Sequence, residues 1–233
     1  FHYGEGSITR KDVKEDYLSA LTDNLSFGKR KVKVVLDPGN GTTSILLNDV
    51  FKRVNVDYTI INGESDGSFP NHHPDPSIED NLTELKEIVL EKNFDVGLAF
   101  DGDGDRVGVI SNKGMFIPID YYMIIIIRDI INKVSNKTFL YDVKCSKSLE
   151  DEIIKLGGTP YCYRTGNSYT KAKVKELDLA FGGELSGHVY FRDKFLGFDS
   201  GIYAGLRLLE ILSNTNKSID ELLDGINRYY STP

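Results

Sequence analysis

Residues 94–106 read Phe-Asp-Val-Gly-Leu-Ala-Phe-Asp-Gly-Asp-Gly-Asp-Arg, an apolar segment followed directly by an acidic one. The first seven residues are nearly all apolar apart from Asp95, a run that is typical of a strand covered on both faces. The six residues that follow are charged or glycine, and they begin where the strand ends. Open α/β sheets bind their ligands beyond the carboxyl ends of their strands, so we predict a binding loop directly after a buried strand.

The loop after this strand carries three aspartates, Asp101, Asp103 and Asp105, separated by Gly102 and Gly104. Glycine permits backbone angles that side chains forbid, so the loop can curl and gather its carboxylates around one point. Three anions held close together repel one another strongly unless a cation lies among them. Ligands that are all carboxylate oxygens suit Mg²⁺, Mn²⁺ or Ca²⁺ better than zinc, and we predict a site for a divalent metal here.

The polar segments of the chain also allow interpretations other than a metal site formed by the three aspartates. An EF-hand requires Gly at position 6 and Glu at position 12 of its loop, where this chain has Arg106 and Asn112. A solvated turn remains an alternative, because Asp and Gly are the commonest turn residues, although strict alternation followed by Arg favours a metal. His72 and His73 also suggest a ligand pair, but their Pro and Asp neighbours favour a structural loop.

Outward from the strand, short apolar segments alternate with amphipathic ones along most of the chain. Alternating strands and helices are the pattern of an α/β layer with a mostly parallel sheet. The pattern starts again after Pro118, so we predict two tandem α/β domains with mixed, mostly parallel sheets, at residues 11–115 and 116–228. The predicted strands are 31–36, 57–61, 94–100, 107–110, 115–117, 138–143, 159–163 and 178–181. The predicted helices are 9–25, 42–53, 77–93, 119–134, 146–156, 168–176, 200–212 and 219–226.

Composition excludes several classes of protein. The chain has 233 residues with 28 basic and 35 acidic side chains, and its net charge of −7 argues against nucleic acid as a partner. The longest apolar run, residues 121–127, is far shorter than the roughly 20 residues of a membrane span, so it is a buried helix or strand and no membrane partner is expected. Two scattered cysteines, Cys145 and Cys162, indicate reduced thiols and a cytoplasmic protein.

Five further segments, together with the acidic loop, resemble motifs of the α-D-phosphohexomutases, the superfamily of phosphomannomutases and phosphoglucomutases. They occur in the family's order, and the resemblance runs from about residue 32 to about residue 212. The acidic loop resembles the family's metal loop, and the fourth segment below resembles its sugar-binding loop. The segments are NHHPDP at 71–76, YDVKCS at 141–146, RTGNS at 164–168, GGELSGH at 182–188 and LGFDSG at 196–201.

The resemblance implies a fold like the second and third of the family's four domains. The first domain of the family carries a phosphoserine and the fourth a phosphate loop, and neither is found in this chain. Residues 1–10 would then be a linker from a missing first domain, and residues 229–233 a linker to a missing fourth domain. The implied activity is Mg²⁺-dependent interconversion of hexose 1-phosphate and hexose 6-phosphate, through the phosphoserine and a bisphosphorylated sugar. This portion alone is expected to be inactive.

The resemblance also implies roles for individual residues near the transferred phosphate. Asp101, Asp103 and Asp105 would hold Mg²⁺, which is the implied cofactor. Arg106 would lie near the phosphate as a catalytic group. Lys144 would contact the hexose phosphate substrate or move a proton at the reacting hydroxyl, which a lysine can do only if its neighbours lower its pKa.

The implied sugar site is the loop at residues 182–188. Glu184 and Ser186 would bind the 3- and 4-hydroxyls of the hexose, and Leu185, Gly187 and His188 would lie beside them in the substrate site. A carboxylate that accepts two hydroxyl hydrogens is a suitable clamp for a sugar. The 3- and 4-hydroxyls are the same in mannose and glucose, so this clamp leaves the preferred hexose open.

One position departs from the family, since Asn167 stands where the family usually has His. Asparagine can donate or accept a hydrogen bond but carries no proton at neutral pH, so our hypothesis is that Asn167 contacts phosphate or hydroxyl through its amide.

Two alternatives to mannose or glucose phosphate mutase activity remain. Phosphoglucosamine mutases tend to have Gln where this chain has Leu185, which lowers that alternative. The other is a non-catalytic module that binds metal and sugar phosphate.

Overall fold

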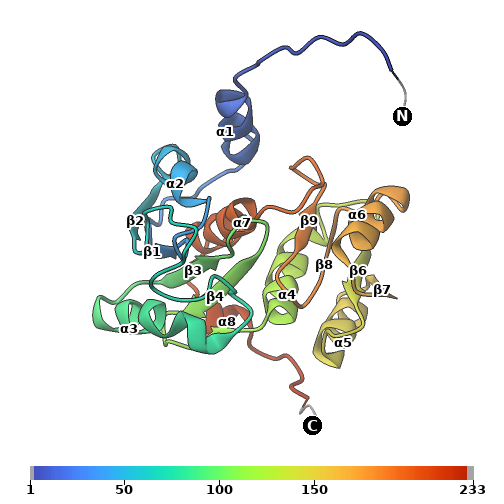
Figure 1. The fold of residues 1–233 in the computed structure, drawn as a ribbon. Coiled ribbons are helices and arrows are strands. Elements are labelled where there is room, and N and C mark those ends of the chain that lie inside the picture. Colours follow the sequence, from blue (N-terminus) through green and yellow to red (C-terminus); the bar gives the residue numbers. More distant parts are fainter. Residues whose placement is uncertain (1–2, 230–233) are drawn as a thin grey trace.

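The computed structural model describes residues 3–229, which form two β-sheets lying side by side with helices around and between them (Figure 1). The first sheet has the strand order β2-β1-β3-β4-β5. Strand β1 pairs in parallel with β2 and β3, whereas β4 and β5 are added in antiparallel orientation. The strands are β1 Val32–Asp37, β2 Val56–Ile60, β3 Val96–Phe100, β4 Val107–Ser111 and β5 Phe116–Ile117.

The second sheet repeats this plan with four strands in the order β7-β6-β8-β9. Its central strand β6 pairs in parallel with β7 and β8, and β9 closes the sheet in antiparallel orientation. These strands are β6 Thr138–Asp142, β7 Thr159–Tyr163, β8 Phe181–Gly183 and β9 Val189–Phe191. The predicted fold class, α/β with mixed and mostly parallel sheets, is confirmed.

The helices follow the strands as the alternating pattern predicts. The predicted helix 77–93 begins as a one-turn 3₁₀ helix, η1, at Glu79 and becomes α-helical only in α3. The hydroxyl of Ser77, before it, donates a hydrogen bond to Asp75. The helices are α1 Lys14–Thr22, α2 Ser44–Phe51, η1 Glu79–Leu82, α3 Thr83–Glu91, α4 Ile119–Ile130, α5 Lys147–Lys155, α6 Asn167–Glu176, α7 Gly201–Ser213 and α8 Ile219–Leu222.

Helices α4 and α7 join the two sheets into one core. Helix α4 contains the longest apolar run of the chain and contacts both β4 and β8, so its apolar residues are buried on nearly every side (Figure 1). Helix α7 comes after the second sheet but packs on β1, β3 and β4 of the first. Gly205 makes room for this contact, because a Cβ at that position would lie 2.9 Å from Leu98. The chain therefore returns to its first sheet after residue 200.

Some predicted features differ from the structure or remain predictions. The predicted strand 178–181 begins only at Phe181, because Asp178 has a left-handed φ of 50° and lies in a turn. Strand β9 was not predicted, since three residues between His188 and Arg192 give too short a pattern. The domain limits stay a prediction, and the predicted linkers 1–10 and 229–233 lie partly outside the described residues. None of the helices within residues 3–229 has the length and apolar character needed to span a bilayer.

Candidate functional site

The acidic loop after β3 and the predicted sugar loop after β8 lie against each other. We call residues 101–106 the metal loop and residues 182–188 the sugar loop. The backbones of Arg106 and His188 pair as an antiparallel bridge, and the N–H of Val107 donates to the carbonyl of Gly187 at 3.4 Å. Gly187 has a φ of 107°, and a Cβ there would lie 3.1 Å from the Cβ of Arg106. The small residue permits the close approach, and the fold brings both predicted loops to one place.

The start of helix α7 also lies on the metal loop. The N–H of Gly201 donates to the carbonyl of Gly104 at 2.9 Å. A Cβ at Gly201 would lie 2.3 Å from the carbonyl oxygen of Arg106, so only glycine fits at this contact. Ser200, directly before the helix, caps it by accepting a hydrogen bond from the N–H of Tyr203. The metal loop is thus held between the sugar loop and the first turn of α7.

Asp101 organises the metal loop from the inside. Its side chain is buried, with the residue only 3% exposed. One carboxylate oxygen accepts hydrogen bonds from the N–H groups of Gly104 and Arg106, at 3.1 and 3.0 Å, and the other accepts from Arg106 Nε at 2.6 Å. Arg106 in turn reaches Asp75 through Nη1 at 3.1 Å. The carboxylate therefore fixes both the backbone of the loop and the direction of its arginine.

The carboxylates of Asp101, Asp103 and Asp105 fit a hard divalent cation. Each offers one oxygen, and these oxygens all lie within 4.8 Å of one another. Burial raises the pKa of Asp105 to about 7, and the neighbouring charges of Asp101 and Asp103 add to the rise, whereas His188 opposes it. The loop thus gathers negative charge that a divalent cation would neutralise. Although Asp101 already accepts several hydrogen bonds, an ionised carboxylate has about four lone-pair positions and can still serve as a ligand.

His72 belongs to the frame of the first sheet rather than to the metal loop. Its Nε2 lies 2.9 Å from a carboxylate oxygen of Asp37, which is fully buried at the end of β1. The other oxygen of Asp37 accepts from the N–H of Gly39 at 2.9 Å and from Asn62 Nδ2 at 3.2 Å. The hydrogen bond to Asp37 raises the pKa of His72 to about 9, even though burial opposes the rise. The structure agrees with the interpretation of residues 71–76 as a structural loop.

This pair predicts a stability that declines in mildly alkaline solution. The pKa of His72 is higher in the folded chain than its unfolded value of about 6.5, so its contribution is complete below that pH and is lost as the pH rises through about 9. At about 1.4 kcal/mol for each pKa unit, we expect the contribution to be about 3 kcal/mol. Urea unfolding at pH 6 and pH 9.5 gives the loss of unfolding free energy between these pH values for the wild type and for His72→Gln. The difference between the two losses is the contribution of His72. The exposed His73→Gln is the control, and equal pH dependences of wild type and His72→Gln would refute the assignment.

Asp142 connects the three loops that follow β6, β7 and β8. It is fully buried at the end of β6. One oxygen accepts from the N–H of Leu185 at 3.0 Å, and the other accepts from the hydroxyl of Thr165 at 2.6 Å. The ammonium of Lys144 lies 3.9 Å from that second oxygen, and half of the lysine side chain is exposed. No role was predicted for Asp142, although it lies in the motif at 141–146 and at the end of a buried strand.

Glu184, which the resemblance predicts to bind sugar hydroxyls, is almost completely buried. The residue is 2% exposed, and its Oε1 accepts hydrogen bonds from the N–H of Gly166 at 2.9 Å and from the hydroxyl of Thr170. Its N–H donates to the carbonyl of His188 at 2.8 Å, which closes the sugar loop. Within residues 3–229 no hydrogen bond engages Oε2, so one oxygen remains for a ligand. Ser186 lies half-buried two residues further along.

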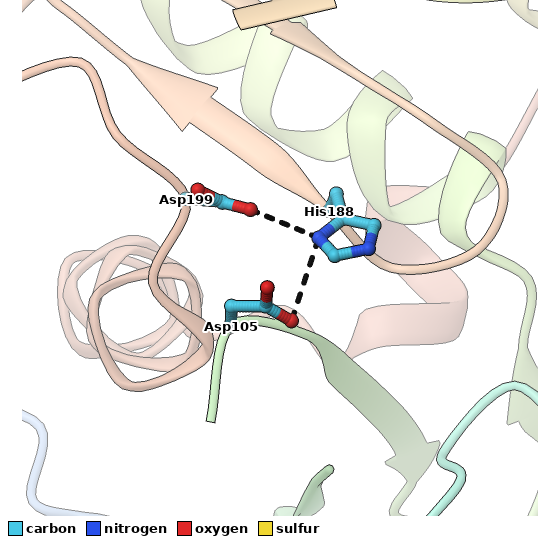
Figure 2. A group of neighbouring side chains, drawn as sticks. All are labelled: Asp105, His188 and Asp199. Carbon is cyan, nitrogen blue, oxygen red and sulfur yellow. Dashed lines mark hydrogen bonds and ion pairs between the residues drawn. The ribbon is translucent and has the colours of Figure 1, made fainter. Parts of the chain in front are cut away.

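His188 connects the two loops through its ring (Figure 2). Its Nδ1 lies 3.0 Å from Asp199 and 3.5 Å from Asp105 of the metal loop. Burial lowers the pKa of His188, but the hydrogen bond to Asp199 and the charge of Asp105 outweigh burial and raise it. Asn167 Nδ2 donates to Asp199 at 2.6 Å, so the amide that we expected to face substrate is bound to a carboxylate. Asp199 lies in the motif at 196–201, but no role was predicted for it.

The structure thus brings together the metal loop, the sugar loop and Asn167, while Lys144 joins them through Asp142. Their chemical roles remain predictions. A cavity of about 500 Å³ lies at the other end of α7 and contains none of these residues. Its charged lining groups are already paired, Arg128 with Glu152 and Lys194 with Glu210, so it presents no free charge for a ligand.

Comparison with known proteins places this geometry among characterised folds. Residues 15–114 match the family model described as phosphoglucomutase/phosphomannomutase, alpha/beta/alpha domain II, and residues 118–229 match domain III. A phosphomannomutase/phosphoglucomutase of Pseudomonas aeruginosa is 38% identical over 99% of the chain, and a phosphoglucomutase of Neisseria gonorrhoeae is 37% identical over 98%. The crystal structure of a phosphoglucomutase/phosphomannomutase family protein from Burkholderia thailandensis superimposes over 100% of the chain with a TM-score of 0.93 and 36% identity.

The match covers only part of those proteins. The chain spans 50% of the Pseudomonas aeruginosa relative, 49% of the Neisseria gonorrhoeae relative and 50% of the Burkholderia thailandensis chain. The two matched family models describe domains numbered II and III, and they follow each other along the chain in that order. The similarity therefore concerns the two sheets and the site between them.

Proposed function

Because this chain belongs to the phosphoglucomutase/phosphomannomutase family, we propose that it forms the metal-binding and sugar-binding part of a hexose phosphate mutase. The reaction would interconvert hexose 1-phosphate and hexose 6-phosphate, with mannose or glucose as the hexose. It would proceed through a phosphoserine and a bisphosphorylated sugar. The phosphoserine would come from a part that the relatives have and this chain does not span, so this portion alone would not turn over substrate.

One observation carries the proposal, namely the direct contact between the metal loop and the sugar loop. The bridge between Arg106 and His188 puts a carboxylate cluster and a sugar-loop carboxylate at the same edge of the fold. A hexose phosphate has a charged end and a hydroxylated end, so a site for it needs both kinds of group close together. The paired loops meet that need with residues from two different sheets.

Each group in the site has a chemical task in this proposal. Asp101, Asp103 and Asp105 would hold Mg²⁺, and bound Mg²⁺ would neutralise charge on the transferred phosphoryl group. Arg106 would add positive charge beside that group, since its guanidinium is already oriented by Asp101 and Asp75. Transfer of a phosphoryl group depends mainly on positioning and on charge stabilisation, which a preorganised loop provides.

The sugar would be held by groups of the second sheet. Oε2 of Glu184 and the hydroxyl of Ser186 would bind the 3- and 4-hydroxyls, and Leu185 and Gly187 would shape the loop around them. Lys144, half exposed and close to Asp142, would contact the substrate or move a proton at the reacting hydroxyl. Placement in the cytoplasm remains part of the proposal and rests on the two scattered cysteines.

Metal binding by this chain is the direct test. We expect Asp103→Asn to weaken Mg²⁺ binding about tenfold or more, because an exposed ligand is lost while the buried frame of the loop stays intact. Isothermal titration with Mg²⁺ measures the change. Asp57→Asn, an exposed aspartate on β2, makes the same change of charge outside the loop and should bind like the wild type. If both variants bind alike, the metal assignment is wrong.

Two other functions are separated by assays of turnover. A protein of the relatives' full length that carries this chain should convert glucose 1-phosphate or mannose 1-phosphate with Mg²⁺ and glucose 1,6-bisphosphate. Faster conversion of glucosamine phosphate would favour a phosphoglucosamine mutase, which Leu185 argues against. The non-catalytic module is favoured for this chain taken by itself, because it spans half the length of the relatives. Turnover by the 233-residue chain alone would refute the need for further domains.

A further inference from the structure

Two carboxylate oxygens lie close to the ring of His188 and restrict where its hydrogen can be. Its Nδ1 is 3.0 Å from Asp199 Oδ2 and 3.5 Å from Asp105 Oδ1 (Figure 2). Both neighbours are carboxylate oxygens, which accept hydrogen bonds. A ring nitrogen without hydrogen is also an acceptor, so it would be repelled by both of them. The short contact with Asp199 therefore requires a hydrogen on Nδ1.

Asn167 fixes the carboxylate that His188 contacts. Its Nδ2 donates to the same Asp199 oxygen at 2.6 Å and lies 3.3 Å from His188 Nδ1. Two donors thus converge on one oxygen, one from the first turn of α6 and one from the start of β9. On the other oxygen of Asp199, Lys171 makes a longer contact at 3.5 Å. This carboxylate is held from both sides before it orients the imidazole.

The second nitrogen of the ring is left for a ligand. Figure 2 shows Nε2 on the far side of the ring from Asp199 and Asp105. In the part of the chain that the structure describes, the hydrogen bonds of His188 go through Nδ1 and the backbone, with none at Nε2. With the hydrogen on Nδ1, the neutral ring presents Nε2 as an acceptor, the arrangement in which a histidine can receive a hydroxyl hydrogen. The fold therefore prepares one tautomer and one orientation.

We propose that Asp199, itself held by Asn167, is a positioning residue that fixes His188 as the Nδ1–H tautomer with Nε2 directed to the sugar hydroxyls. The proposal deepens the proposed function and rests on it for the identity of the ligand. It gives Asn167 a task that needs no charge, because an amide donor is sufficient to hold Asp199. It also explains why the amide of Asn167 points to a carboxylate rather than outward.

A shared cation is the alternative explanation of this cluster. Asp105, His188 and Asp199 also lie within 4.8 Å of one another through single ligand atoms. A metal on Nδ1 would require that nitrogen to carry no hydrogen, and the hydrogen of the neutral ring would then be on Nε2. The two explanations therefore predict opposite tautomers, which makes them distinguishable by one measurement.

The experiment is nitrogen NMR of this chain labelled with ¹⁵N-histidine. The spectra are recorded at a pH high enough for the His188 ring to be neutral, with a single N–H. The chain has only four histidines, and His188→Gln identifies the signal. We expect the wild type to show the Nδ1–H tautomer and Asp199→Asn to shift it toward the Nε2–H form or a mixture. Lys171→Gln removes another contact of the same carboxylate and should leave the spectrum unchanged. An Nε2–H tautomer in the wild type, or an unchanged tautomer in folded Asp199→Asn, overturns the proposal.

Turnover gives a second and separate readout. In a protein of the relatives' length that carries this chain, Asp199→Asn should lower kcat about tenfold or more and change KM by less than about threefold, because orientation of a group is lost while the other substrate contacts remain. A raised KM with an unchanged kcat would contradict a role in positioning. If no variant shows mutase activity, the proposed function fails, whereas the NMR spectrum still decides the tautomer.

Discussion

Asp101→Asn is expected to lower the free energy of unfolding by about 3 kcal/mol and to weaken Mg²⁺ binding as well. The carboxylate is buried and accepts three hydrogen bonds, two from backbone N–H groups and one from Arg106 Nε. An amide at this position has one acceptor oxygen, and its NH₂ group would face the guanidinium of Arg106 as a second donor. Denaturant unfolding measures the stability, and isothermal titration measures the affinity for Mg²⁺.

The matched control is Asp103→Asn in the same loop. Asp103 is exposed, so this variant should lose affinity for metal while its stability changes by less than about 0.5 kcal/mol. The two variants therefore separate the frame of the loop from its ligands. Equal stabilities of the two variants would mean that Asp101 does not organise the loop.

Arg207→Met is expected to destabilise the chain by about 3 to 5 kcal/mol. Arg207 is fully buried on α7, where its guanidinium pairs with Asp193 at 2.8 Å and with Glu210 at 3.2 Å. It also lies over the ring of Phe191 on β9, with 4.8 Å between the guanidinium carbon and the ring centroid. Methionine fills much of the same volume but leaves the largely buried carboxylate of Asp193 without its partner. Thermal and urea unfolding measure the loss.

Arg207→Lys tests whether charge or volume explains that loss. Lysine keeps the positive charge but has no planar fork to reach two carboxylates, so we expect roughly half the loss of the methionine variant. A methionine variant within about 1 kcal/mol of wild type would show that the buried ion pair adds little, as replacement by apolar groups does in some proteins. The same result would mean that the contacts of Arg207 between α7 and β9 contribute little to stability.

The local features of the site were predictable from sequence because their signals lie within a few residues. The apolar run before Asp101 predicts β3, and the alternating Asp and Gly predict a loop that gathers carboxylates. The run at 121–127 predicts a buried element, and the structure has it inside α4. In each case neighbouring residues determine both the pattern and the structure.

The contacts that hold the site together were not predictable in the same way. Asp142 and Leu185 are 43 residues apart, and Asn167 and Asp199 are 32 apart. Such pairs depend on the register of the second sheet and on the turn before α6. No single-sequence pattern reports either of them. The packing of α7 on the first sheet was missed for the same reason, since its apolar face would suit either sheet.

The bridge between Arg106 and His188 has a mechanical consequence. The two loops share backbone hydrogen bonding, and the first turn of α7 is fixed to one of them, so the carboxylate cluster and the sugar clamp would move as one rigid body. Under the proposed function, a bisphosphorylated sugar that presents both of its ends to the same ion would rotate between loops whose separation stays constant.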